Sequence, residues 1–267
     1  MTLLSLALSF AAAGSVSMLA LRVRALAPSG FVAATIVGGV ITACGGWQWG
    51  VLLLAFFVSS SALSRIAHRR RPDQGLDTVR GARRDAWQVL ANGGVALACA
   101  LLWWLTGRDW LITAFAASLT AAAADTWATE IGAFSRHRPR SITTMRPVER
   151  GVSGGVSPLG TAAALLGALL MAMFAAFLLD HPNATRTEAI IGVGIAGFAG
   201  CLIDSLLGAT LQVQFRCPKC NLFTERRTHR CGTATHYARG VAWLNNDVVN
   251  ISAILAGALI GALFVAI

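Results

Sequence analysis

Two hydrophobic stretches of this 267-residue sequence contain carboxylates that could bind a metal ion. Asp125 and Glu130 fall within residues 111–132, and Asp204 falls within residues 189–213. Charged groups are costly inside a membrane and are usually functional there, so we expect these acids to have a chemical role. If both stretches cross the membrane in one direction, Asp125 and Asp204 lie about eight and nine residues from the inner end. At 1.5 Å per residue this depth is roughly 12–14 Å.

Small residues next to the two aspartates predict that their helices pack closely. Four alanines directly precede Asp125, and Gly197 and Gly200 precede Asp204. Small side chains let membrane helices approach one another, which would bring the carboxylates together. Mg²⁺ is commonly bound by one or two carboxylates together with substrate phosphates. We therefore predict that Asp125, Glu130 and Asp204 hold Mg²⁺; the alternative is that they are polar contacts that stabilise the helix bundle.

Amide and guanidinium side chains near the same end of the stretches could bind an anion. Asn246 and Asn250 are four residues apart and so share a helix face, and Asn92 lies early in another stretch. We predict that these amides hydrogen-bond phosphate or nucleotide, although each could equally be a contact between helices. Arg84 and Arg150 could neutralise the charge of a phosphoryl group during its transfer.

A glycine- and serine-rich segment spans residues 150–161 and leads into a hydrophobic stretch, with Pro158 suited to the first helical turn. Backbone N–H groups at Gly151, Ser153, Gly154 and Gly155 could cradle phosphate, assisted by the helix N-terminus that follows. The segment lacks the Gly-Lys-Ser/Thr ending of a Walker A loop, and a plain turn is an equally good interpretation.

A second group of metal-binding residues lies near the C-terminus, with the spacing C-x2-C-x8-H-x-C. Its members are Cys217, Cys220, His229 and Cys231. Three thiolates and one imidazole suit tetrahedral Zn²⁺, and four protein ligands leave no open position, so we predict a structural zinc site. A redox role is less favoured because no thioredoxin-like βαβ pattern surrounds the cysteines.

The composition indicates a membrane protein. Hydrophobic residues make up 55% of the chain and charged residues 13%, against about 25% charged in soluble domains, which argues against an ordinary soluble enzyme. We predict an all-α, polytopic membrane bundle of about eight transmembrane helices, one domain over residues 1–267, with residues 214–244 as an inserted cytoplasmic Cys/His loop. The predicted spans are residues 1–21, 30–44, 51–64, 88–106, 111–132, 159–179, 189–213 and 248–267.

The net charge of +10 is distributed in a way that predicts the orientation. With eight spans, twenty of the 22 Lys and Arg residues fall on one side, and only Arg108 and Arg186 fall on the other. The positive-inside rule then places the basic side in the cytoplasm and both termini outside. We expect a multi-pass protein of a bacterial inner membrane with a cytoplasmic active face. Because the basic residues lie in short loops between spans, they indicate topology rather than nucleic-acid binding.

These motifs resemble an integral membrane family that includes human transmembrane protein nineteen and the plant chloroplast phytyl phosphate kinase. The matching segments are residues 26–30, 88–93, 124–132, 151–157, 204–212 and 246–250, which together extend over nearly the whole chain. The most specific is the run Ala-Asp-Thr-Trp-Ala-Thr-Glu-Ile-Gly around Asp125 and Glu130. Only part of this family carries the cysteine cluster, which sets it apart from the shared core.

The resemblance implies a kinase that transfers the γ-phosphate of a nucleotide, CTP by analogy with the plant member, to an isoprenoid monophosphate in the membrane. A phosphate monoester is already an anionic nucleophile, so such an enzyme mainly positions two phosphates and neutralises charge. Alternatives are an ion- or proton-coupled small-molecule transporter, a CDP-alcohol or isoprenoid transferase that uses the same acids, and a structural scaffold. A transporter is less favoured because the polar groups gather on one side and the visible repeat is a weak parallel one.

Overall fold

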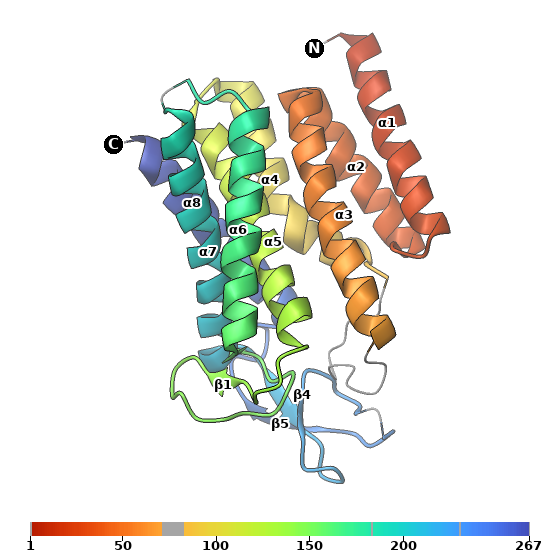
Figure 1. The fold of residues 1–267 in the computed structure, drawn as a ribbon. Helices are drawn as coiled ribbons and strands as arrows, with labels where there is room; N and C mark the ends of the chain where they lie inside the picture. Colours follow the sequence, from red (N-terminus) through yellow and green to blue (C-terminus); the bar gives the residue numbers. More distant parts are fainter. Residues whose placement is uncertain (1, 71–82, 183, 230, 267) are drawn as a thin grey trace.

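A computed structural model describes residues 2–70, 83–182, 184–229 and 231–266 of the chain, and it is predominantly helical (Figure 1). The described residues contain eight helices that are long and apolar enough to cross a membrane. They are α1 (Leu3–Arg22), α2 (Pro28–Gly45), α3 (Trp47–Arg70), α4 (Ala86–Thr106), α5 (Trp110–Gly132), α6 (Pro158–Leu178), α7 (Arg186–Thr210) and α8 (Asn246–Ala266). Each helix overlaps one predicted span, so the predicted helical membrane bundle is confirmed.

Local sequence signals set several helix boundaries. Asp85 and Gln88 form a reciprocal capping box at the start of α4, where the side chain of each accepts a hydrogen bond from the backbone N–H of the other. Pro158 is the first residue of α6, a position whose backbone N–H would have no acceptor within the helix. Gly46 and Gly107 have positive φ angles at the turns that join α2 to α3 and α4 to α5.

Helix α5 is the centre of the bundle. Every residue from Leu111 to Ala124 is buried, as expected for a helix that is apolar on all sides. It packs against α3, α4, α6, α7 and α8, and the ring of Phe115 lies 4.2 Å from that of Trp49 on α3. Helix α1, by contrast, lies at the edge of the bundle beside α2 (Figure 1).

Both chain termini lie at one end of the bundle, and the short strands of the described residues lie at the other, which we call the strand end (Figure 1). Strands β1 (Arg140–Ser141) and β2 (Gly155–Val156) pair antiparallel between α5 and α6. Between α7 and α8, β3 (Gln214–Arg216) is the central strand of an antiparallel sheet with β4 (Phe223–Thr224) and β5 (His236–Arg239). The sequence predicted only a loop over this last segment.

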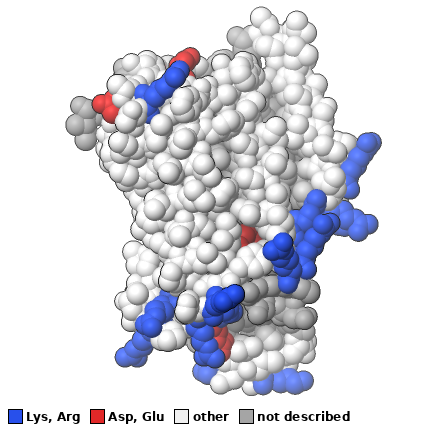
Figure 2. Space-filling model, in the orientation of Figure 1, with Lys and Arg blue, Asp and Glu red and all other residues white. Residues whose placement is uncertain are grey.

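Basic side chains gather toward the strand end and are sparse at the end with the termini (Figure 2). Arg108 and Arg186, the two predicted exceptions, lie in the α4–α5 connection and at the start of α7, at the end with the termini. Arg71, Arg80 and Arg230 belong to the predicted basic side but lie outside the described residues. The even number of spans therefore separates the charge as the sequence predicted.

Candidate functional site

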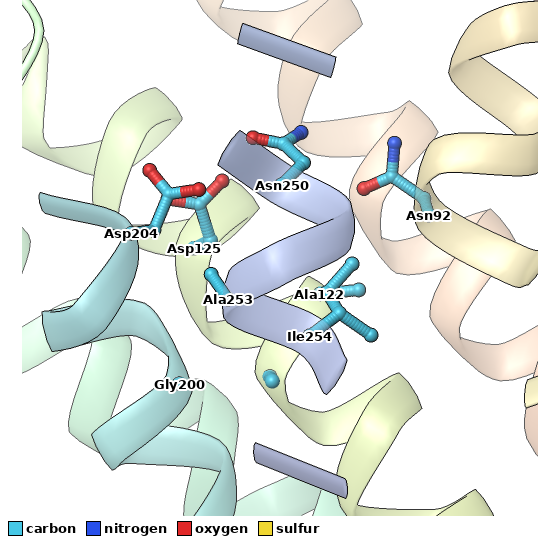
Figure 3. Close-up of a pocket in the computed structure, with 9 residues that line it drawn as sticks. Asn92, Ala122, Asp125, Gly200, Asp204, Asn250, Ala253 and Ile254 are labelled. Atoms are coloured by element: carbon cyan, nitrogen blue, oxygen red, sulfur yellow. The ribbon is translucent and has the colours of Figure 1, made fainter. Parts of the chain in front are cut away.

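The two intramembrane aspartates meet at one small cavity of about 10 Å³. Asp125 of α5 and Asp204 of α7 line it together with Asn92 of α4 and Asn250 of α8 (Figure 3). The two carboxylates point the same way, and the two amides lie across from them (Figure 3). Four helices thus contribute four oxygen-bearing side chains to one space, and all four residues were predicted site residues. The remaining lining residues are Ala121, Ala122, Gly200, Ala253 and Ile254.

Close helix packing brings the aspartates together, as predicted. A Cβ atom added to Gly197 would lie 2.3 Å from Cγ2 of Thr120, and one added to Gly200 would lie 2.7 Å from Cβ of Ala121. On α8, a Cβ atom on Gly257 would lie 3.1 Å from that same Ala121 atom. Glycines on α7 and α8 therefore let both helices approach the central α5, because any side chain there would collide with it.

Asp204 lies closer to the end of its helix than the sequence predicted, whereas the end of the helix that carries Asp125 was predicted correctly. Helix α5 ends at Gly132 and α7 at Thr210, seven and six residues beyond Asp125 and Asp204. Their depth from those ends is therefore roughly 9–11 Å at 1.5 Å per residue. The prediction placed the end of the seventh span at residue 213, but the chain leaves the helix at Leu211 to enter β3. The similar depth of the two acids, on helices of the same direction, holds.

The cavity residues differ in burial: the two aspartates are half-buried, whereas Asn250 is almost completely buried. The continuous buried run of α5 ends at Ala124, and Asp125 is half-buried, as is Asp204. Asn250 is only 3% exposed, and its Oδ1 accepts a hydrogen bond of 3.4 Å from Nδ2 of Asn246. Nδ2 of Asn92 donates to a carbonyl one turn earlier in α4. The carboxylates therefore lie where the buried core gives way to more open structure.

Glu130 does not share this cavity. Its Oε1 accepts a hydrogen bond of 2.6 Å from Oγ of Ser64 on α3. Five residues separate Glu130 from Asp125, which is about 140° around a helix of 3.6 residues per turn, so the two side chains leave α5 in different directions. The role predicted for Glu130 as a third ligand of the same ion stays a prediction.

The glycine-rich segment forms a tight turn beside the end of α7. Gly151 and Gly154 have φ angles of +85° and +80°. A Cβ atom on Gly154 would lie 2.4 Å from Ala209, five residues after Asp204, so the turn rests against the helix that carries the second aspartate. The Gly155 N–H donates to the carbonyl of Val152 within the turn and is thus engaged in this conformation. The turn therefore lies against the last turn of α7, and Gly155 is not available to cradle phosphate with that N–H.

The two predicted arginines occupy different environments. Arg84 lies just before α4. Its guanidinium is 5.6 and 5.7 Å from the ring centres of Phe56 and Phe57 on α3. The guanidinium of Arg150 donates to the carbonyl oxygens of Ala133 and Ser135, just beyond α5. In this position Arg150 satisfies acceptors at a helix end, where a cation is also favoured by the helix dipole. Its predicted role in neutralising phosphate stays a prediction.

The four predicted zinc-binding residues do converge. The ligand atoms of Cys217, Cys220, His229 and Cys231 all lie within 4.8 Å of one another. Cys217 and His229 are buried, whereas the other two cysteines are exposed. Hydrogen bonds with Thr233 and with the His229 ring lower the pKa of Cys231 to about 5, and a hydrogen bond with Cys231 raises the pKa of Cys220 to about 11. This cluster could hold a metal ion.

Several polar contacts at the strand end were not predicted. Ser64 contacts Glu130, and Glu225 contacts Ser153, across separations of 66 and 72 residues in the sequence. Gln212, which is 2% exposed, donates to the same carboxylate of Glu225. Ser64 and Glu225 lie in no motif that would have marked them, since their partners become neighbours only through the packing of distant segments.

The fold and the cavity define a multi-pass helical membrane protein in which two aspartates and two asparagines line one cavity between helices. The chain belongs to the family described as integral membrane protein DUF92, which matches residues 11–258. It is 32% identical over 231 residues to Protein PGR of Arabidopsis thaliana, covering 79% of each chain. It is 30% identical over 241 residues to an uncharacterised membrane protein of Methanocaldococcus jannaschii, covering 90% of this chain and 86% of the relative.

A third relative is the chloroplastic Protein VTE6 of Arabidopsis thaliana, which is 27% identical over 248 residues, or 91% of this chain and 66% of the relative. These matches confirm the family that the motifs indicated. No solved structure matches this chain.

Proposed function

We propose that this protein is an isoprenoid monophosphate kinase, which transfers the γ-phosphate of a nucleoside triphosphate to a phytyl or prenyl monophosphate in the membrane. The observation that carries the proposal is the meeting of Asp125, Asp204, Asn92 and Asn250 in one cavity within the strand-end half of the bundle. The family resemblance supplies the reaction class and suggests CTP as the donor. The strand end would face the cytoplasm, where nucleotides are available and where basic residues are expected.

The donor set fits Mg²⁺, the cation that such a reaction requires. Two carboxylates and two amides offer only hard oxygen ligands, which Mg²⁺ prefers, and the cavity residues include no thiol or imidazole. Asp125 and Asp204 would hold the ion through their carboxylates. When bound, Mg²⁺ would neutralise charge on the nucleotide phosphates and the transferring phosphoryl group.

The two kinds of side chain in the cavity suit ions of opposite charge. Asp125 and Asp204 carry carboxylates, which favour a cation. Asn92 and Asn250 lie in the first two turns of α4 and α8 and carry amide N–H groups that can donate to an anion. In this proposal the amides of Asn92, Asn246 and Asn250 hydrogen-bond phosphate oxygens on the side opposite the carboxylates.

The acceptor lipid would reach this cavity with its tail between helices and its phosphate at the strand end. Because the acceptor is a phosphate monoester, its oxygen attacks the γ-phosphorus directly, and the bond from that phosphorus to the nucleotide's bridging oxygen breaks. The chain's own groups then have to position two phosphates in line and exclude water. The turn that contains Ser153 and Gly154 lies against the last turn of α7, and in this proposal it would cover the nucleotide phosphates from the strand end.

The test is a phosphate-transfer assay on purified protein in nanodiscs with Mg²⁺. Each of the four γ-³²P-labelled nucleotides is paired with phytyl, geranylgeranyl or farnesyl monophosphate, and Asp125→Asn serves as the inactive variant. We expect label in a lipid diphosphate that the variant fails to form. Label or nucleotide incorporated in a different product would instead identify a CDP-alcohol or isoprenoid transferase. No product with any pair, from protein shown to be folded, would reject the kinase, and flux measurements in proteoliposomes would then test a transporter.

A further inference from the structure

The Cys/His cluster closes the turn between two strands of the small sheet. Cys217 directly follows β3, and the chain returns to β4 after Cys220. Within the turn, the N–H of Cys220 points to Sγ of Cys217 at 3.5 Å, and the N–H of Asn221 donates to the Cys217 carbonyl at 2.8 Å. An N–H directed at sulfur stabilises a thiolate, which is the form of cysteine that binds metal. The turn is therefore shaped like one half of a metal knuckle.

The second half of the cluster is another tight turn. The N–H of Gly232 donates to the carbonyl of His229 at 2.9 Å, and the N–H of His229 donates to the carbonyl of Thr233 at the same distance. This turn brings Nδ1 of His229 within 3.1 Å of Sγ of Cys231, while the Sγ atoms of Cys217 and Cys231 are 3.6 Å apart. The 3.6 Å between these two sulfurs is too long for a disulfide, which needs about 2.05 Å, and is close to the roughly 3.8 Å between two sulfurs that share one tetrahedral Zn²⁺.

The sheet that carries the cluster is small. Its strands contain three, two and four residues, and sheets of this size are marginal without additional support. Large side chains around it are exposed: Phe223 is 40% exposed, Tyr237 59% and Trp243 68%. A bound metal ion is a common means by which such a small unit becomes stable.

One residue connects this sheet to the glycine-rich turn. Glu225 directly follows β4, and its Oε1 accepts hydrogen bonds from Oγ of Ser153 at 2.8 Å and from Nε2 of Gln212 at 2.7 Å. Gln212 lies just after α7 and before β3. The carboxylate thus joins the glycine-rich turn, the end of α7 and the Cys/His sheet. Its position depends on the register in which Phe215 pairs with Thr224.

We propose that Cys217, Cys220, His229 and Cys231 bind one structural Zn²⁺, which holds Glu225 in place as a clamp on the glycine-rich turn. The zinc fixes the β3–β4 turn, the turn fixes the strand register, and the register places Glu225 between Ser153 and Gln212. Glu225 is therefore a positioning residue for the turn over residues 151–156. The value of this clamp to phosphate transfer rests on the proposed function, but the zinc site and the clamp do not.

The zinc site is tested on the full-length protein, purified in nanodiscs without added metal or a histidine tag, by elemental analysis. We expect about one Zn²⁺ per chain in the wild type, a loss of most of it in Cys217→Ser, and no change in the matched variant Cys44→Ser, whose cysteine lies in α2 away from the cluster. Wild-type protein without zinc that also fails to bind added Zn²⁺ would overturn the zinc site.

The clamp is tested by amide hydrogen exchange over residues 151–156, a measurement that requires no enzymatic activity. We expect Glu225→Ala and zinc chelation each to raise exchange in this turn about tenfold, while α5 amides stay protected. Glu225→Gln keeps an acceptor oxygen and should restore protection, and Glu149→Ala, at an exposed glutamate of the same segment, should have no effect. Unchanged exchange in Glu225→Ala or after chelation would overturn the clamp. If both tests succeed while no nucleotide and lipid pair reacts, the proposed kinase activity fails alone.

Discussion

Asp125 on α5 and Asp204 on α7 face one cavity from two helices that run in the same direction, each six or seven residues before its helix ends. The pair is opposite Asn250, which is almost completely buried at the start of α8. A cation would meet the two carboxylates, and an anion would meet the N–H donors of the amides. This arrangement is the basis of the proposed metal-assisted phosphate transfer, and four predictions follow from it and from the packing around it.

Replacing either cavity aspartate with asparagine should abolish most phosphate transfer while the protein remains folded. Asp125→Asn and Asp204→Asn each remove one negative charge from the proposed Mg²⁺ site, and we expect kcat/KM to fall roughly 10²–10³-fold. The matched control is Asp180→Asn, at an exposed aspartate at the end of the bundle with the termini. The Mg²⁺ dependence of the rate provides the measurement, and wild-type rates in either cavity variant would reject the metal assignment.

Glu130→Gln should have a much smaller effect than the cavity variants. The side chain bonds Ser64 rather than lining the cavity, and glutamine keeps an oxygen that can accept from that hydroxyl. We expect kcat/KM to fall less than about tenfold, which is under about 1.4 kcal/mol in transition-state free energy. A loss as large as that of Asp125→Asn, together with a higher Mg²⁺ requirement, would instead place Glu130 among the ligands of the ion.

Gly154→Ala should displace the glycine-rich turn. Alanine there would adopt an unfavourable φ of +80° and put its Cβ 2.4 Å from Ala209. We expect a loss of at least about 1–2 kcal/mol in the stability of the turn and a raised KM for the nucleotide. Gly94→Ala in α4, where nothing lies within 4 Å of the new atom, is the control and should leave both thermal unfolding and KM nearly unchanged. An unaltered KM in Gly154→Ala would argue against contact between this turn and the nucleotide.

Gly200→Ala should separate the helices that carry the aspartates. The added methyl group would lie 2.7 Å from Cβ of Ala121 and 3.2 Å from the carbonyl oxygen of Ala253. Neither atom can move without a shift of the helix backbone that carries it. Overpacking of this kind costs about 1–3 kcal/mol, so we expect a lower melting temperature in detergent and weaker Mg²⁺ binding. Gly194→Ala on the same helix meets only an ordinary contact at 3.6 Å and should match the wild type. Equal melting temperatures for the two variants would contradict the close packing of α5 and α7.

The sequence by itself determined the spans and the one-sided distribution of basic residues, and it marked Asp125 and Asp204 as intramembrane acids at similar depth. These follow from local properties, because a hydrophobic run of about 20 residues makes a span. Small residues such as Gly197 and Gly200 mark the face on which a helix can approach its neighbour. Each depends on residues close together in the chain, which is why the predicted and observed helix ends agree within three residues except at α3, which begins four residues earlier and ends six residues later than predicted.

Only the tertiary structure decided which partners the remaining polar side chains contact. Glu130 contacts Ser64 instead of the cavity, and Glu225 contacts Ser153, through pairings of residues 66 and 72 positions apart. Such contacts depend on how helices rotate about their axes and on the register of a short sheet, neither of which a hydrophobic pattern specifies. The hydrogen bond from the N–H of Gly155 to the carbonyl of Val152 likewise depends on the geometry of the folded turn. Residue types therefore showed which groups could act, and the packing of distant segments decided which of them meet.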